Sequence, residues 1–287
     1  MNSITNYLLK GQSGKPVSLD VYWSEVESRQ PIVIFAHGFK GFKDWGHWQK
    51  IAIEFVKAGY CFIKFNFSHN GTTPEDALNF SDLEAFGQNN YTKELEDLQT
   101  VIDWVVEEQE LKQKIHWNVQ DITLIGHSRG GPIALIGAKE NEVVQQVITW
   151  ASVHELDYSW HQKEAQIAAW KEEGVHFIMN GRTKQKMPLY YQLYENYKAN
   201  EERLSVQKTL QDLDKPYLIL HGGADPAVPA SAAEYLQKNA KRAELHVIEA
   251  ANHVFGGVHP YQKEELPLHS KELVQKCLDF LKKTNKK

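Results

Sequence analysis

The sequence predicts an α/β protein with a mostly parallel central sheet and helices on both of its faces. Two observations lead to this fold class. Short apolar runs alternate with amphipathic helical stretches along most of the 287 residues, and Gly follows several of the apolar runs. Strands that alternate with helices form βαβ units, and right-handed crossovers place the helices on both faces of the sheet. The length fits one domain over residues 1–287.

The first two predicted strands form an antiparallel hairpin at the edge of the sheet. They cover Thr5–Lys10 and Val17–Trp23, and a turn rich in Gly and Ser separates them. The next run, Pro31–Ala36, is apolar throughout and ends at His37-Gly38. A continuous apolar run bounded by Gly is typical of a central parallel strand buried on both faces.

The alternation then continues to the end of the chain. Further strands are predicted at Tyr60–Phe67, Asp121–Ile125, Val147–Ser152, Pro216–Leu220 and Glu244–Ile248. Helices are predicted at Trp48–Ala58, Thr92–Glu108, Gly130–Lys139, Ala230–Asn239 and Ser270–Lys282. The longest of these helical patterns repeats its apolar residues at helical spacing, so one face is expected to pack on the sheet.

The alternation stops over residues 153–213. This stretch carries helical patterns and no convincing buried strand, so we expect a helical cap inserted between two core strands, as a lid over the site. It is rich in aromatic residues, among them Trp170, Tyr190 and Tyr191. Such side chains either pack the insertion onto the sheet or contact substrate. The sequence leaves both roles open, and these three are candidate substrate-binding residues.

Composition excludes several function classes. The net charge of −5 gives no general attraction to nucleic acid or to an anionic membrane. We find no apolar run long enough to span a membrane and no signal-peptide pattern at the start, so we expect a cytoplasmic protein. The two cysteines, Cys61 and Cys277, are predicted to be buried free thiols. No metal-ligand cluster is evident, and no metal or cofactor is expected.

The strongest chemical signal is Gly126-His127-Ser128-Arg129-Gly130. It lies between a predicted strand and a predicted helix, which is the context that distinguishes a G-x-S-x-G nucleophile elbow from a chance match. The glycines allow strand and helix to approach closely at a tight turn. The turn holds the Ser128 hydroxyl clear of the sheet, and the N-terminal end of the following helix points its positive dipole end at a developing oxyanion.

A serine hydroxyl needs a base to become a nucleophile, and in this architecture the chain order is Ser, acid, His. Asp225 follows the predicted strand 216–220, and His253 follows the predicted strand 244–248. Both therefore lie past the carboxyl ends of parallel strands, where open α/β sheets place their reacting groups. We predict a triad of Ser128, Asp225 and His253.

Other residues compete for these roles. His259 is the main rival base, and Glu155 or Asp157 could replace Asp225 as the acid, because geometry and not chain position defines a triad. Three histidines that flank a glycine at the end of a strand are interpreted as turn or scaffold residues: His37, His127 and His221.

An oxyanion hole needs two N–H groups directed at the developing charge. We expect one from Arg129, the residue after the nucleophile, and the other from Phe39, in the loop that follows the strand 31–36. The Arg129 side chain forms an ion pair or contacts a substrate carboxylate. We favour the ion pair.

With these residues in place, the sequence resembles the α/β-hydrolase superfamily, and within it the dienelactone-hydrolase-like and cinnamoyl/feruloyl-esterase-like serine hydrolases. The resemblance runs from His37-Gly38-Phe39 through the elbow and Asp225 to His253. It implies the α/β-hydrolase fold, with a helical insertion where residues 153–213 lie. True dienelactone hydrolases carry a cysteine nucleophile, whereas this chain carries Ser128.

The expected function is ester hydrolysis through an acyl-enzyme intermediate, with a small-molecule ester as substrate. Two alternatives remain. The same triad could hydrolyse small peptides or amides, and a protein with this fold could bind a ligand without turnover.

Overall fold

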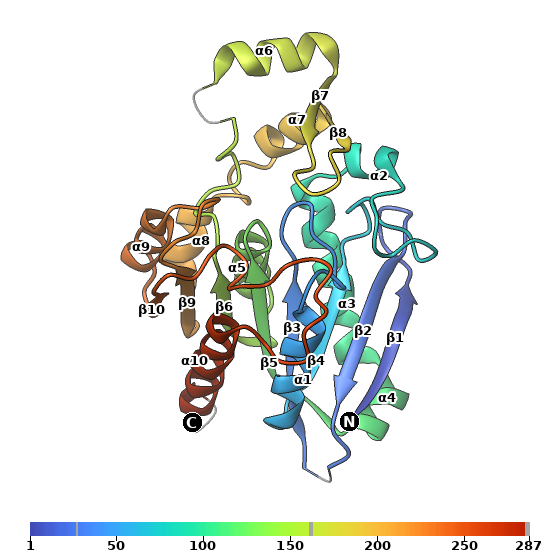
Figure 1. Cartoon of the computed structure of the whole chain (residues 1–287), viewed down its shortest axis with the longest axis vertical. Helices are drawn as coiled ribbons and strands as arrows, with labels where there is room; N and C mark the ends of the chain where they lie inside the picture. Colours follow the sequence, from blue (N-terminus) through green and yellow to red (C-terminus); the bar gives the residue numbers. More distant parts are fainter. Residues whose placement is uncertain (27, 161–162, 285–287) are drawn as a thin grey trace.

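The computed structural model describes residues 1–26, 28–160 and 163–284 (Figure 1). The central sheet contains β1 (Asn2–Leu9), β2 (Val17–Trp23), β3 (Gln30–Ala36), β4 (Cys61–Asn66), β5 (Trp117–His127), β6 (Val144–Trp150), β9 (Tyr217–Gly222) and β10 (Ala243–Ile248). The helices are α1 (Trp48–Lys57), α2 (Leu83–Gly87), α3 (Tyr91–Glu107), α4 (Gln109–Ile115), α5 (Gly130–Glu140), α6 (Glu164–Glu173), α7 (Gln192–Ala199), α8 (Val206–Asp212), α9 (Ala230–Asn239) and α10 (Leu268–Thr284).

The eight strands lie in the order β1-β2-β4-β3-β5-β6-β9-β10. β1 and β2 form the predicted antiparallel edge hairpin, β2 pairs antiparallel with β4, and every later neighbouring pair is parallel. This confirms the predicted fold class. The strands and helices predicted outside residues 153–213 are present, with ends shifted by a few residues, and the short helices α2 and α4 were not predicted. The two cysteines are buried and free, as expected.

Helices cover both faces of the sheet, and alternate residues of β3 show how. Ile32 and Ile34 are buried in the layer formed with α3, α5 and α8. Val33 and Phe35 are buried in the other layer, with α1 and α10. Successive side chains of a strand point to opposite faces, so a strand packed between two helical layers is apolar at every position, as the sequence of β3 predicted.

Residues 153–213 connect β6 to β9 and contain more than helices. Besides α6, α7 and α8 they form an antiparallel hairpin of β7 (Val175–Met179) and β8 (Lys186–Tyr190). The expectation of a purely helical segment is therefore corrected. The hairpin gave no clear sequence signal because both strands have only five residues, β7 is partly exposed, and β8 contains Pro188. In Figure 1, α6, α7 and the hairpin project from one end of the body, whereas α8 packs against α5 and α9.

The turn from β5 into α5 leaves no room for side chains at its glycines. A Cβ atom on Gly126 would lie 2.2 Å from the carbonyl oxygen of Gly130. A Cβ atom on Gly130 would lie 2.5 Å from the carbonyl oxygen of Ala36 at the end of β3. The backbones of β3, β5 and α5 are therefore in direct contact at this point, and only glycine fits there.

We expect Gly126→Ala to lower the free energy of unfolding by roughly 1–3 kcal/mol or more, the usual cost of overpacking. The new methyl group can be accommodated only if strand or helix moves. Urea denaturation followed by circular dichroism measures the change. Gly181→Ala is the matched control, because nothing lies within 4 Å of its added Cβ. Equal stability of the two variants would contradict the close packing described here.

Four of the buried histidines are uncharged at neutral pH. Burial lowers the pKa of His37, His47 and His69 to about 4 in each case. Burial also lowers the pKa of His127 to about 3. Each imidazole is therefore neutral in the folded protein at pH values where the same group in an unfolded chain takes up a proton.

We expect the protein to lose stability on mild acidification. Below pH 6.5 the unfolded chain binds protons at these four imidazoles and the folded protein does not, so acid favours unfolding. Burial raises the pKa of Asp97, to about 7, and that of Asp121, and these two groups oppose the effect. Because four histidines act against two carboxyl groups, the net effect of acid is a loss of stability. We predict that the free energy of unfolding falls by at least about 1.4 kcal/mol between pH 6.5 and pH 5.5. Denaturant titrations at both pH values would refute this if stability stayed level or rose.

Candidate active site

Ser128 is the first residue after β5 and has an unusual backbone conformation. Its φ is 55°, in the left-handed region that residues other than glycine rarely occupy. Backbone hydrogen bonds hold it there: the Ser128 N–H donates to the carbonyl of Trp150 at 2.9 Å, and the Gly131 N–H donates to the carbonyl of Ser128 at 3.0 Å. Strain of this kind is stored at functional sites when the surroundings impose it.

Asp225 and His253 come together from the loops that follow β9 and β10. The His253 Nδ1 atom lies 2.8 Å from Asp225 Oδ2. The other oxygen of Asp225 accepts hydrogen bonds from the N–H groups of Ala227, at 2.8 Å, and Val228, at 3.0 Å. Burial alone would raise the pKa of Asp225, but the hydrogen bonds from His253 and Val228 hold it below its ordinary value. The carboxylate therefore stays ionised, and His253 Nδ1 carries the proton of their hydrogen bond.

His127 fixes the backbone of the loop that carries His253. The His127 Nε2 atom lies 2.9 Å from the carbonyl oxygen of His253. Because the imidazole of His127 is neutral and a carbonyl only accepts, Nε2–H is the donor. The two imidazole rings are also in contact, with centroids 4.8 Å apart. His127 is thus a scaffold residue, as the sequence indicated.

Ser128 and His253 line one cavity of about 220 Å³, here called the nucleophile cleft. Phe39 and Lys40 also line it, and so does Asn180, from the turn between β7 and β8. Sequence reasoning missed Lys40 and Asn180 as lining residues. Lys40 follows a predicted site residue and could have been suspected, whereas Asn180 belongs to the hairpin that the sequence did not reveal.

The loop after β3 brings Phe39 to the same place. The Gly41 N–H donates to the carbonyl of Gly38 at 3.0 Å, and Lys40 has a φ of 56°, so the chain turns tightly around Phe39. A Cβ atom on Gly38 would lie 2.9 Å from the Cβ atom of Ser128, so this loop touches the elbow. Among the described residues, the backbone N–H groups of Phe39 and Arg129 donate to no hydrogen bond.

A group of four charges, three of them buried, anchors this loop to the sheet. Lys43 Nζ lies 2.8 Å from Asp20 on β2 and 2.6 Å from Asp44, and Lys64 on β4 binds the same two carboxylates. The side chains of both lysines are at most 1% exposed. Burial alone would raise the pKa of Asp20, but Lys64 and Lys43 lower it below its ordinary value. No sequence signal indicated this group, because Asp20 and Lys64 meet only through the pairing of β2 with β4, and Lys43 and Asp44 join them from the loop after β3.

The Arg129 side chain forms an ion pair, the role favoured above. Its guanidinium lies 2.5 Å from the Glu94 carboxylate on α3, and both side chains are buried. The Asn89 amide also donates to Glu94, at 2.7 Å. The guanidinium lies over the ring of Phe39, with 4.1 Å between its carbon and the ring centroid, and over the ring of Tyr91, at 5.6 Å.

A second cavity of about 220 Å³, here called the cap cavity, lies where residues of the projecting segment meet the body. Trp170 lines it, together with Trp160, Tyr158, Arg129 and Phe39. The other two aromatic candidates line neither cavity. The Tyr190 hydroxyl donates to Glu84 at 2.5 Å, and the Tyr191 ring packs against Trp170 and Tyr194.

The rival residues have other partners. His259 Nδ1 accepts a hydrogen bond from the Gly46 N–H at 2.8 Å, and its ring stacks on Trp45. Glu155 and Asp157 line a different surface depression, beside α8. The acid in contact with His253 is therefore Asp225.

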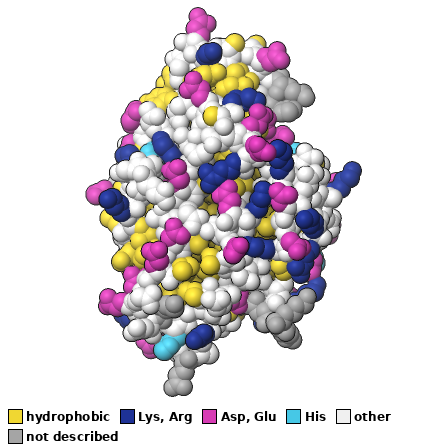
Figure 2. All heavy atoms as spheres, turned by 180° about the vertical axis from the view of Figure 1, so that it is seen from behind, with side chains coloured by type: hydrophobic (Ala, Val, Ile, Leu, Met, Phe, Trp, Pro, Cys, Tyr) yellow, Lys and Arg dark blue, Asp and Glu magenta, His cyan; other side chains and the backbone are white. Residues whose placement is uncertain are grey.

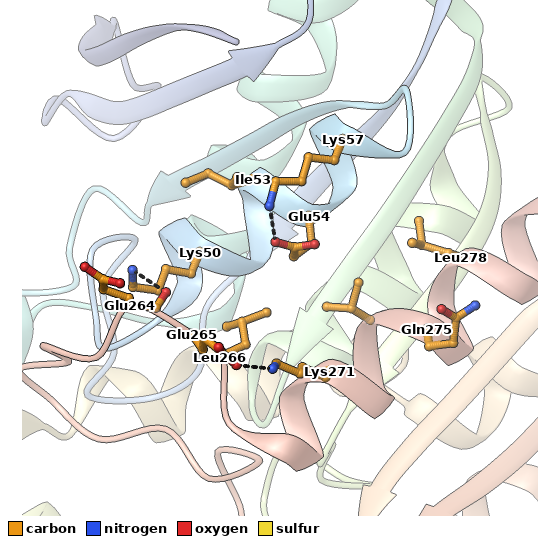
Figure 3. Close-up of a pocket in the computed structure, with 11 residues that line it drawn as sticks. Lys50, Ile53, Glu54, Lys57, Glu264, Glu265, Leu266, Lys271, Gln275 and Leu278 are labelled. Atoms are coloured by element: carbon orange, nitrogen blue, oxygen red, sulfur yellow. Dashed lines mark hydrogen bonds and ion pairs between the residues drawn. The ribbon is translucent and has the colours of Figure 1, made fainter.

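Another depression lies between α1 and α10, and Figure 3 shows its lining. The lysines that line it already have partners. Lys57 forms an ion pair with Glu54, Lys271 forms one with Glu265, and Lys50 donates a hydrogen bond to the carbonyl of Glu264. None of the predicted triad residues lines it.

Figure 2 shows a face where Lys and Arg side chains are interspersed with Asp and Glu.

The described part of the chain holds no group of three or more His, Cys, Asp or Glu side chains arranged to bind a metal ion. Within that same part, no helix is both long and apolar enough to cross a membrane.

Solved structures share this fold. Est1E from Butyrivibrio proteoclasticus with bound ferulic acid is 18% identical, with a TM-score of 0.70, and the match covers 98% of this chain and 100% of that chain. A putative dienelactone hydrolase from Klebsiella pneumoniae is 16% identical, with a TM-score of 0.61 and coverage of 98% and 99%. A puromycin-hydrolyzing peptidase from Mycobacterium tuberculosis is 17% identical, with a TM-score of 0.62 and coverage of 99% and 39%.

No curated protein matches the sequence. The profile of the Alpha/beta hydrolase family matches residues 33–263, which include the β3 loop, the elbow and the loops of Asp225 and His253. This match spans most of the chain and confirms the resemblance noted from the sequence. The chain therefore belongs to the alpha/beta hydrolase family.

Proposed function

We propose that the protein is a serine hydrolase that cleaves carboxylic esters, with Ser128 as nucleophile, His253 as general base and Asp225 as the group that orients His253. The observation that carries the proposal is the 2.8 Å contact between His253 and Asp225, on a histidine that shares one cavity with Ser128. A base oriented by a carboxylate beside a serine on a strained turn is the arrangement that nucleophilic catalysis requires.

Each step of the reaction has a group to perform it. The Nδ1–H of His253 donates to Asp225, which leaves Nε2 free to take the Ser128 proton as the serine oxygen attacks the ester carbonyl. The N–H groups of Phe39 and Arg129, which have no other acceptor among the described residues, bind the resulting oxyanion. His253 then passes its proton to the leaving alcohol. A water molecule, deprotonated by His253, attacks the acyl-enzyme, and the acid leaves as Ser128 regains a proton.

The cap cavity supports an aromatic or medium-sized apolar acyl group. Trp170, Trp160 and Tyr158 line it, and aromatic side chains present large apolar surfaces to a bound ring or chain. The Arg129 guanidinium also lines this cavity, and its charge is balanced by Glu94. A neutral acyl group therefore fits this cavity better than an anionic one.

We expect wild-type protein to hydrolyse p-nitrophenyl esters and Ser128→Ala to lose at least about 10⁴-fold in kcat, because the variant has no nucleophile. Ser3→Ala, at an exposed position on the edge strand, is the matched control and should keep full activity. Release of p-nitrophenol measures ester turnover, and covalent labelling by a fluorophosphonate probe measures the reactivity of Ser128. A p-nitroanilide series run in parallel compares amides with esters.

A folded wild-type protein that releases no p-nitrophenol from acetate through cinnamate esters and takes up no probe would overturn the proposal. That outcome would favour a binding protein with the hydrolase fold. Faster turnover of anilides than of the matching esters would instead identify an amidase or peptidase.

Trp170→Leu should lower kcat/KM for aromatic acyl esters relative to short aliphatic ones by about tenfold, the scale of discrimination in apolar pockets. The ratio of kcat/KM for cinnamate and acetate esters measures this change. Phe177→Ala is the control, since that side chain is 49% exposed and lines neither cavity. An unchanged ratio in Trp170→Leu would show that the cap cavity does not bind the acyl group.

A further inference from the structure

Phe39 is the residue that the two cavities have in common. Ser128 and His253 line the nucleophile cleft, and Arg129 and Trp170 line the cap cavity. Among the described residues, Phe39 alone lines both. Ser128 lines one cavity and its neighbour Arg129 lines the other, so the two cavities are adjacent at the elbow. Phe39 therefore stands between the reacting groups and the aromatic cavity.

The ring of Phe39 is held firmly in this position. The Arg129 guanidinium lies 4.1 Å from its centroid, and the ring of Phe86 stacks on it with centroids 5.6 Å apart and an interplanar angle of 24°. Arg129 is itself fixed by the ion pair with Glu94. The contact of the Phe39 ring with the guanidinium and its stacking on Phe86 are both favourable. Movement of the Phe39 ring would break both contacts.

The chemistry of ester cleavage decides which part of a substrate approaches Phe39. His253 protonates the leaving alcohol, so the alcohol lies on the side of the cleft formed by His253 and Val254. The carbonyl oxygen lies at the N–H groups of Phe39 and Arg129. The remaining substituent of the carbonyl carbon, the acyl group, points away from His253. The cap cavity contains no residue of the His253 loop and contains Phe39 and Arg129, so it lies on the acyl side.

We propose that the Phe39 ring is a wall across the acyl site and sets the size of acyl group that the enzyme accepts. This inference rests on the proposed ester hydrolysis. Small acyl groups fit in the nucleophile cleft with the ring in place. An acyl group that reaches the cap cavity must displace the ring from Arg129 and Phe86. The same residue thus has two roles, because its backbone N–H binds the oxyanion and its side chain selects the acyl group.

Phe39→Ala tests this because it removes the ring and keeps the backbone N–H. We expect kcat/KM for bulky acyl esters, p-nitrophenyl octanoate and 2-naphthoate, to rise at least tenfold relative to p-nitrophenyl acetate. Phe39→Leu should give an intermediate ratio. A second series of acetate esters with alcohols of increasing size should show no such change. Phe177→Ala, an exposed phenylalanine of the hairpin, controls for general loss of a ring.

The outcomes separate this inference from the proposed function. If the wild type shows ester hydrolysis that depends on Ser128, and Phe39→Ala has an unchanged acyl profile or loses activity equally on every ester, the wall is refuted and ester hydrolysis stands. A shift in the alcohol series instead of the acyl series would also refute it, by placing the cap cavity on the leaving-group side. Thermal unfolding of each variant confirms that profiles are compared between folded proteins.

Discussion

The candidate active site depends on backbones that touch where side chains would normally keep them apart. At the elbow, Gly126 and Gly130 bring β5, α5 and β3 into contact. The same kind of contact occurs between the neighbouring loops. A Cβ atom on Gly38 would meet the Cβ atom of Ser128 at 2.9 Å, and one on Gly222 would meet the carbonyl of Ala251 at 2.4 Å. The loop of Phe39 is thus packed on Ser128, and the loop of Asp225 on that of His253. Close-packed backbones have few alternative arrangements, which is what a preorganised site requires.

Buried charges complete the positioning of these loops. Lys43 and Asp44 attach the loop of Phe39 to Asp20 and Lys64 on the sheet. Burying ions is costly, and such pairs add little net stability compared with apolar packing. Removing one member leaves the remaining buried charges unbalanced, so the loop has one strongly preferred position. The group therefore contributes more to the geometry of the loop than to the stability of the fold.

Local sequence signals predicted much of the fold and of the candidate site. The run of β3, the elbow around Ser128, and the position of His253 after the last strand each depend on a few neighbouring residues. Features that depend on the pairing of distant segments escaped prediction. The β7–β8 hairpin has short, partly exposed strands, and Asp20 meets Lys64 only through the register of β2 with β4. The same limit explains the aromatic candidates. Which of Trp170, Tyr190 and Tyr191 lines a cavity depends on how the hairpin and α6 pack, and composition carries no such information.

The elbow also explains why acyl selection and oxyanion binding are assigned to one loop. The N–H groups that bind the oxyanion must lie beside the nucleophile, so the loop of Phe39 cannot move away from Ser128. In the proposed binding mode, the side chain on that loop lies beside the acyl group, on the side opposite His253. Arg129 meets the same condition from the elbow itself, and its guanidinium lies on the Phe39 ring. In the proposed mechanism, binding of the oxyanion places these two side chains at the start of the acyl site, and the projecting segment with Trp170 shapes only what lies beyond them.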